Sequence, residues 1–275
     1  AGCEVFLLPR ALPTPVLAYA TKALNADIGV MVTASHNPPA DNGYKVYVGP
    51  TTDGITYACS QIINPTDGFI ADEISAITSL ASQPRGSNWA MVGEEIIEEY
   101  ISRTASLATD PGSLSIVYTA MHGVGTETLS KVFKEAGFPD LILVSQQSEP
   151  DPDFPTVAFP NPEEPGAIDL ALDTAKAVSA DLVIANDPDA DRCAAAIKDR
   201  NGQWRMLRGD ELGVIFGEWI ARTAPTGTFG NSIVSSSILK KISAHYGINF
   251  KEVLTGFKWL AKIEDLAFGY EEAIG

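Results

Sequence analysis

The sequence predicts an α/β fold made of consecutive α/β/α layered domains, in which helices cover mostly parallel, mixed sheets. Short runs rich in apolar and β-branched residues alternate with helical patterns along the whole chain, which is typical of βαβ units. The chain has 275 residues, of which 45% are hydrophobic and 20% are charged, so it can bury a substantial core. Its length favours about two compact units of roughly 100–200 residues.

The individual elements follow from local patterns taken in chain order. The expected strands are residues 4–8, 28–33, 115–119, 141–144, 181–186, 233–236 and 250–254. The expected helices are residues 16–24, 94–105, 126–136, 166–179, 209–222, 238–245 and 257–266. Thr14 and Pro15 supply a cap and a first-turn proline for the first helix, and Gly137 follows the third helix as a terminator.

Two loops rich in Pro, Gly and Thr divide the chain. Residues 108–112 follow an amphipathic helix pattern, and residues 223–227 form the second break. We therefore expect an incomplete first domain over 1–107, a whole second domain over 108–223 and the start of a third over 224–275. The last segment holds only about 50 residues, too few for a βαβ-rich domain. Because the sequence also lacks an initiator Met, we expect a fragment.

Composition narrows the function classes. The formal net charge is −16 and no basic stripe offsets it, so nucleic acid is not an expected partner. No run of 18 apolar residues occurs, so we expect no membrane span. Cys3, Cys59 and Cys193 are far apart and fit no CxxC spacing, which favours a reducing cytoplasm over a disulfide framework or a thiolate zinc site. An anionic small molecule stays open as a substrate, provided that a few cations gather at its site.

The first loop with candidate chemistry is Thr33-Ala34-Ser35-His36-Asn37-Pro38, which follows an apolar strand. Open α/β sheets place ligands at such strand ends, so Ser35 is a candidate nucleophile. Ser, His, Asn and Pro also form ordinary polar turns, and His36 alone is uninformative. Lys45 comes ten residues after Ser35, behind a turn, and could neutralise phosphate or accept a hydroxyl proton. The alternative for Lys45 is a solvated strand residue.

The second loop is Asp187-Pro188-Asp189-Ala190-Asp191-Arg192, again behind a buried type of strand. Three carboxylates on alternate residues can converge on a hard cation, and oxygen ligands suit Mg²⁺. A calcium EF-hand loop is excluded, because Arg192 stands where that loop needs Gly and Lys198 stands where it needs Glu. A surface acidic turn is the remaining alternative.

The Ser35 loop and the acidic loop could supply ligands to the same metal ion. The acidic loop offers only three protein oxygens, and a phosphate oxygen on Ser35 would supply a further ligand to the metal. Arg192 has a fixed fork of donors that could hold the same phosphate.

Two further loops, at residues 255–259 and 269–275, contain glycines and charged residues and form the third candidate element. Lys258, next to Gly256, could meet a substrate phosphate. Glu271 and Glu272 could accept hydrogen bonds from sugar hydroxyls. Charged, glycine-containing loops are also common on any surface, so these two segments carry little weight by themselves.

Taken in order, the Ser35 loop with Asn42-Gly43-Tyr44-Lys45, the acidic loop and the two late loops resemble the α-D-phosphohexomutase superfamily. The resemblance covers essentially the whole chain. Residues 119–125 and 159–165 look closest to the phosphoglucomutase-2 branch, which includes phosphopentomutases.

The resemblance implies roles for particular residues. Ser35 is expected to be the phosphoserine and a metal ligand, together with Asp187, Asp189 and Asp191 for Mg²⁺. Lys45 falls on the family's general acid/base position, and Glu271 on its sugar-hydroxyl acceptor. The remaining expected site residues are Arg192 and His36 for catalysis, and Gly256, Lys258 and Glu272 for substrate. One departure is Ala273, where many members carry Ser, and it leaves the preferred sugar open.

The activity implied by the resemblance is transfer of a phosphoryl group between the 1- and 6- (or 5-) hydroxyls of a hexose or pentose phosphate. It would proceed through phosphoserine and a sugar 1,6-bisphosphate. The alternatives are a bisphosphate synthase or phosphatase and a non-catalytic sugar-phosphate binding protein. A serine hydrolase is disfavoured because Ser35 lacks a G-x-S-x-G elbow. The family's fourth domain and its first glycine- and arginine-containing loop have no counterpart here, so we expect low activity from the chain alone; its oligomeric state stays open.

Overall fold

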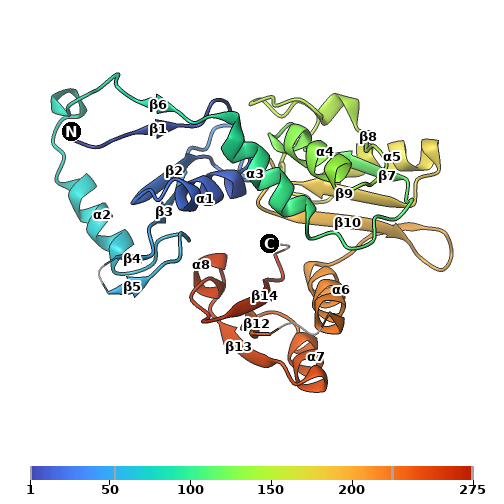
Figure 1. Cartoon of the computed structure of the whole chain (residues 1–275). Coiled ribbons are helices and arrows are strands. Elements are labelled where there is room, and N and C mark those ends of the chain that lie inside the picture. The colour runs from blue at the N-terminus through green and yellow to red at the C-terminus, as the bar shows by residue number, and fades with distance from the viewer. Residues whose placement is uncertain (1, 53, 224–225, 274–275) are drawn as a thin grey trace.

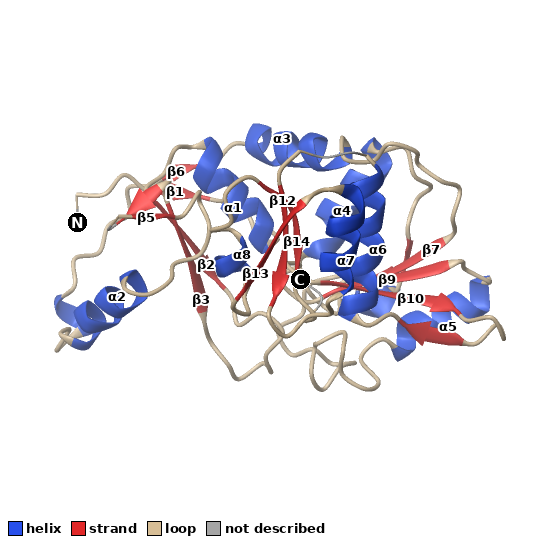
Figure 2. Ribbon diagram, turned by 90° about the horizontal axis from the view of Figure 1, so that it is seen from below, coloured by secondary structure: helices blue, strands red, loops and turns tan. Residues whose placement is uncertain are grey.

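The computed structural model describes residues 2–52, 54–223 and 226–273. Its elements gather into three parts that follow one another along the chain (Figure 1). The first part runs from blue to green at α3, the second from green to light orange at β10, and the third from orange to red. Figure 2 shows that the strands form separate sheets with helices packed beside them, which agrees with the strand pairing. The predicted α/β class is confirmed.

The first part contains small sheets and three α-helices. Strand β1 pairs in parallel with β6, and β2 pairs antiparallel with β3. Helices α1 and α3 bury apolar side chains against each other, with Val16 and Ile97 fully buried. The elements are β1 (Phe6–Leu7), α1 (Thr14–Ala23), β2 (Ile28–Val32), β3 (Tyr44–Val48), β4 (Thr51–Thr52), β5 (Ile55–Thr56), α2 (Thr66–Ser75), η1 (Leu80–Ser82), β6 (Ala90–Met91) and α3 (Glu94–Ala105).

The second part is built on a five-stranded mixed sheet of order β11-β10-β9-β7-β8. Strand β7 runs parallel to β8 and β9, while β10 pairs antiparallel with both β9 and β11. Its core combines Val117 and Val183 of the sheet with Ala171 of α5. The elements are β7 (Ile116–Thr119), α4 (Gly125–Glu135), β8 (Ile142–Leu143), η2 (Ser145–Gln147), α5 (Asp169–Val178), β9 (Leu182–Asn186), β10 (Cys193–Lys198) and β11 (Trp204–Met206).

The third part is a parallel sheet with β12 between β13 and β14. Helix α6 lies so close to this sheet that a Cβ on Gly213 would stand 2.3 Å from the ring of Tyr270, so the close approach requires glycine. Phe229 and Leu239 complete the core. The elements are α6 (Gly209–Arg222), β12 (Thr228–Ser232), α7 (Ile238–Tyr246), β13 (Asn249–Val253), α8 (Phe257–Leu260) and β14 (Leu266–Tyr270).

Two expectations for the third part were wrong. The strand expected at 233–236 is β12, five residues earlier, and Ile233 and Val234 are exposed. Strand β12 contains Gly230, whose missing Cβ makes room for Ile263, so packing forms a strand that propensity disfavours. The helix expected over 257–266 ends at Leu260, and the chain then enters β14.

Other boundaries differ by smaller amounts. Helix α5 begins at Asp169 instead of residue 166. Strands β3, β10, β11 and β14 were not expected, and the antiparallel β9–β10–β11 pairing makes the second sheet mixed. Among the described residues, no helix is both long and apolar enough to cross a membrane.

Candidate active site

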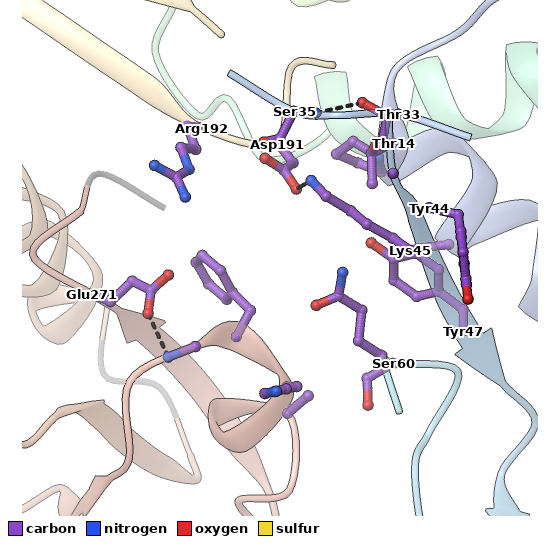
Figure 3. Close-up of a pocket in the computed structure, with 18 of the residues that line it drawn as sticks. Thr14, Thr33, Ser35, Tyr44, Lys45, Tyr47, Ser60, Asp191, Arg192 and Glu271 are labelled. Atoms are coloured by element: carbon purple, nitrogen blue, oxygen red, sulfur yellow. Dashed lines mark hydrogen bonds and ion pairs between the residues drawn. The ribbon is translucent and has the colours of Figure 1, made fainter. Parts of the chain in front are cut away.

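A cavity of about 720 Å³ brings the predicted loops together. All three parts of the chain contribute to its wall. Figure 3 shows Ser35, Lys45 and Asp191 grouped on one side, with Arg192 and Glu271 facing the same open space. The predicted site residues that line it are Ser35, His36, Lys45, Asp191, Arg192, Gly256, Lys258 and Glu271.

Ser35 lies in a tight turn just beyond β2. Its φ of 55° is in the left-handed region, and its N–H donates to Oγ1 of Thr33 at 2.8 Å. The turn directs the Ser35 hydroxyl toward the second part, where it donates to Oδ2 of Asp187 at 3.3 Å. Nδ1 of His36 lies 3.4 Å from the Ser35 Oγ. The predicted nucleophile therefore stands next to the acidic loop, 152 residues away in sequence.

The acidic loop follows β9 directly and is held in shape by its own backbone. The N–H of Arg192 donates to Oδ1 of Asp187 at 3.0 Å, and Ala190 has a φ of 54°. One carboxylate oxygen from each of Asp187, Asp189 and Asp191 lies within 4.8 Å of the others. Burial, with repulsion from Asp189 and Asp191, raises the pKa of Asp187 to about 8.

These three carboxylates fit a divalent cation. Oδ1 of Asp189 is buried and has no hydrogen-bond partner among the residues that the structure describes, which is costly for a carboxylate oxygen unless a cation meets it. The donor set consists of oxygens alone, as Mg²⁺ prefers. Asp187, Asp189 and Asp191 could therefore hold such an ion.

Lys45 partly neutralises the acidic loop. Its ammonium donates to Oδ2 of Asp189 at 2.7 Å and also to Oδ2 of Asp191. Burial lowers the pKa of Lys45, but attraction to Asp191 and Asp189 outweighs it, so the pKa lies above its ordinary value. Lys45 is therefore an ammonium ion at neutral pH.

Arg192 and His36 complete this side of the cavity. Within the part of the chain that the structure describes, the Arg192 guanidinium has no ion pair and no side-chain hydrogen bond, so its donors are available to an anion. Burial, followed by the positive charge of Arg192, lowers the pKa of His36. His36 is therefore a neutral imidazole at pH 7.

The opposite wall comes from the third part. The carboxylate of Glu271 accepts the Gly256 N–H at 2.7 Å, which ties the two late loops together. Burial raises the pKa of Glu271, and the Gly256 hydrogen bond lowers it by less. Lys258 lines the cavity without an ion pair among the described residues. Glu272 does not line it, because its carboxylate accepts the hydroxyls of Ser232 and Ser235 at 2.7 and 3.0 Å.

Two segments that carried the family resemblance pack against the site. The turn after β7 contacts the acidic loop so closely that a Cβ on Gly123 would lie 2.3 Å from the Pro188 backbone. The ring of Phe159 lies edge to face with that of His36, with centroids 6.0 Å apart. Both segments therefore shape the loops that carry the candidate chemistry.

Sequence reasoning missed several cavity residues. Tyr47 lies two positions after Lys45 on β3, so the alternation of a strand would have placed both on one face. Ser60 and Gln61 follow no recognisable pattern. Thr14 was predicted as the cap of the first helix, but Pro13 stands at the cap position and the Thr14 hydroxyl donates to Asp189 of the acidic loop.

Comparison with known proteins gives three domain matches in order along the chain. Residues 1–63 match phosphoglucomutase/phosphomannomutase alpha/beta/alpha domain I, residues 96–202 match domain II and residues 208–275 match domain III.

Curated relatives agree with the domain matches. A Haemophilus influenzae protein named "Probable phosphomannomutase" is 48% identical, over 100% of this chain and 57% of its own length. A human phosphopentomutase is 35% identical, over 100% of this chain and 48% of its own, and a human glucose 1,6-bisphosphate synthase is 37% identical, over 98% and 47%. This chain spans about half the length of these relatives.

A crystal structure of a phosphoglucomutase/phosphomannomutase family protein from Burkholderia thailandensis supports the fold. It superposes with a TM-score of 0.73 at 21% identity, over 95% of this chain and 55% of that one. Fold and matched domains together define a protein of the phosphoglucomutase/phosphomannomutase class. The chain belongs to the α-D-phosphohexomutase superfamily.

Proposed function

We propose that this chain is the phosphoryl-transfer core of a phosphosugar mutase. The observation that carries the proposal is the position of the Ser35 hydroxyl, which lies 3.3 Å from Asp187 in a loop of the type that binds metal cations. The adjoining cavity is also lined by two positively charged side chains that form no ion pair among the described residues. Arg192 and Lys258 are those cations. Phosphoryl transfer depends mainly on positioning and on neutralising charge, and this arrangement provides both.

The proposed cycle has two transfers. In the first, the P–O bond to Ser35 Oγ breaks and a P–O bond to the free hydroxyl of a sugar phosphate forms. Lys45 gives a proton to Ser35 Oγ and takes the proton that the sugar hydroxyl releases, so the charges balance. The sugar 1,6-bisphosphate then reverses its orientation in the cavity, and its other phosphoryl group is transferred to Ser35. The net reaction moves phosphate between the 1- and 6- (or 5-) hydroxyls.

The other site residues support these transfers. Arg192 holds the reacting phosphoryl oxygens, since its guanidinium fork matches them. His36 stays neutral and orients the Ser35 hydroxyl, which lies 3.4 Å from its Nδ1. Glu271 accepts sugar hydroxyls, and Lys258 meets the substrate phosphate. Asp187, Asp189 and Asp191 would hold Mg²⁺, which when bound would supply positive charge at the transferring group.

We also propose a domain division and a cellular compartment for this core. It comprises three consecutive domains, and helix α6, which the expected domain over 108–223 assigned to the second, goes with the third because it packs on α7 and β14. Cys3, Cys59 and Cys193 are free thiols, which suits a reducing cytoplasm.

A second candidate is sugar bisphosphate synthesis, favoured by the 37% identity to a glucose 1,6-bisphosphate synthase. The same Ser35 centre would carry out this synthesis, and the bisphosphate would be released instead of reorienting in the cavity. The ratio of released bisphosphate to isomerised monophosphate separates the two activities.

Substitution of the nucleophile tests the proposal. With Mg²⁺, a bisphosphate primer and glucose or ribose 1-phosphate, S35A should lose isomerisation by about 10³-fold or more, since no covalent carrier remains. The matched control is S75A, because the Ser75 hydroxyl is exposed on α2 and, among the described residues, bonds only the Ala71 carbonyl of its own helix. Isomerisation that is measurable in the unsubstituted chain and persists undiminished in S35A would contradict the mechanism.

A further inference from the structure

Helix α1 touches the acidic loop at its first residue. Thr14 is 1% exposed, and its hydroxyl donates to Oδ2 of Asp189 at 2.7 Å. Its backbone N–H donates to the carbonyl oxygen of Asp189 at 2.9 Å. Thr14 of the first part is thus hydrogen-bonded to both the side chain and the main chain of Asp189, 175 positions away.

The Thr14 hydrogen bond selects which oxygen of Asp189 is free. Both Thr14 and Lys45 donate to Oδ2, and Oδ1 is left buried without a partner. Thr14 is a neutral donor, so a cation at the acidic loop would not repel it, whereas it would repel the charged Lys45. The hydroxyl therefore fixes the carboxylate rotamer that leaves Oδ1 available.

The same helix also packs against the strand that leads to Ser35. A Cβ on Gly29 of β2 would lie 2.1 Å from Oγ1 of Thr21 on α1, so helix and strand are in close contact. Strand β2 ends at Val32, three residues before Ser35. Helix α1 therefore connects the acidic loop, through Thr14, to the strand that carries the Ser35 turn.

We infer that Thr14 is a positioning residue, which holds Asp189 in the orientation that binds a divalent cation and aligns the acidic loop with the Ser35 turn. The inference rests on the proposed function, in that the cation serves phosphoryl transfer. Thr14 acts through Asp189 and touches neither sugar nor phosphate in this account. Hydrogen-bond partners of metal ligands commonly set metal affinity by 10-fold or more.

Direct binding of Mn²⁺, used as a spin-active probe for the Mg²⁺ site, tests the inference without turnover. The variants are T14V, which keeps the shape but loses the hydroxyl, and T14S, which keeps the hydroxyl. We expect T14V to bind Mn²⁺ about tenfold more weakly and T14S to bind within about threefold of the unsubstituted chain. T14A replaces T14V if the valine variant does not fold.

The matched control is T21V. Thr21 is a buried threonine of the same helix, but its hydroxyl bonds only the carbonyl of Leu17 within the described part of the chain. T21V should bind Mn²⁺ like the unsubstituted chain even if its melting temperature falls as far as that of T14V. Equal Mn²⁺ affinity of T14V and the unsubstituted chain, or an equal loss in T21V, would overturn the inference and leave the proposed function standing. Failure of the unsubstituted chain to bind Mn²⁺ would overturn the metal site itself.

Discussion

Burial controls the protonation of the acidic loop. Asp187 is fully buried, and its pKa of about 8 means that the cation-free chain holds a proton there at neutral pH. The unfolded chain releases that proton near the ordinary aspartate pKa of about 4. Between about pH 4 and 8 the folded chain therefore binds more protons than the unfolded chain, so its stability falls as pH rises.

We expect this slope to appear in the cation-free chain and to depend on Asp187. In EDTA, the free energy of unfolding should fall from pH 5 to pH 7 by an amount approaching about 1 kcal/mol per pH unit. D187N carries no such proton and should show a flatter profile, and saturating Mg²⁺ should restore stability at pH 8 by stabilising the ionised carboxylates. Urea midpoints at each pH measure the effect. The same slope in D187N would contradict it.

The positions of the side chains show which residues of the candidate site could be predicted from the sequence. Ser35 and Asp187 lie in loops directly after strands of two different sheets, so local pattern singled out each loop, and only the chemistry of a metal and a phosphate suggested that the two loops meet. Glu271 and Glu272 directly follow β14, and Glu272 begins a turn, so their two carboxylates reach different partners. Glu271 faces the cavity and Glu272 faces Ser232. Thr14 was out of reach because its partner is 175 residues away.

Propensity misled the reading of some strands. Strand β10 is Cys-Ala-Ala-Ala-Ile-Lys, and alanine is a poor strand former, so only its pairing with β9 and β11 makes it a strand. Strand β3, Tyr-Lys-Val-Tyr-Val, has the composition of a strand and could have been found from it. The helices α3, α6 and α7 were predicted within one or two residues, because their apolar periodicity matches their buried faces.

The segment around α8 docks the third part on the first. Trp259 packs on the cluster of Val46, Val48, Tyr57 and Ile63. Lys262 lies 4.0 Å from the centre of the Tyr57 ring and donates to Oγ of Ser60 at 2.6 Å. Burial lowers the pKa of Lys262 to about 8. This contact holds the Gly256–Lys258 wall of the cavity opposite Lys45.

Removing the Lys262 contact should weaken sugar-phosphate binding and leave cation binding unchanged. Loss of an interaction worth about 1 kcal/mol corresponds to roughly fivefold weaker binding. Calorimetric titration of K262A with glucose 1-phosphate measures the first effect, and Mn²⁺ titration measures the second. K251A, a charge loss at an exposed position on β13, is the matched control. Unchanged glucose 1-phosphate affinity in K262A would show that this docking contact does not support the cavity.

The candidate site depends on how the three parts are assembled. The first part supplies Ser35 and Lys45, the second supplies the carboxylates and Arg192, and the third supplies Glu271 and the neighbouring loops. Contacts between distant residues join them, including Arg10 with Glu127 at 2.9 Å. No single part contains a complete phosphoryl-transfer centre in this account.

The most direct test of the account is the intact mass of the chain after exposure to glucose 1,6-bisphosphate and Mg²⁺. We predict an increase of about 80 Da, one phosphoryl group, located on Ser35 by peptide mapping and discharged when excess glucose 1-phosphate is added. S35A should show no increase, and S75A should match the unsubstituted chain. An unmodified Ser35, or a phosphoryl group on another residue that persists in S35A, would contradict the central claim.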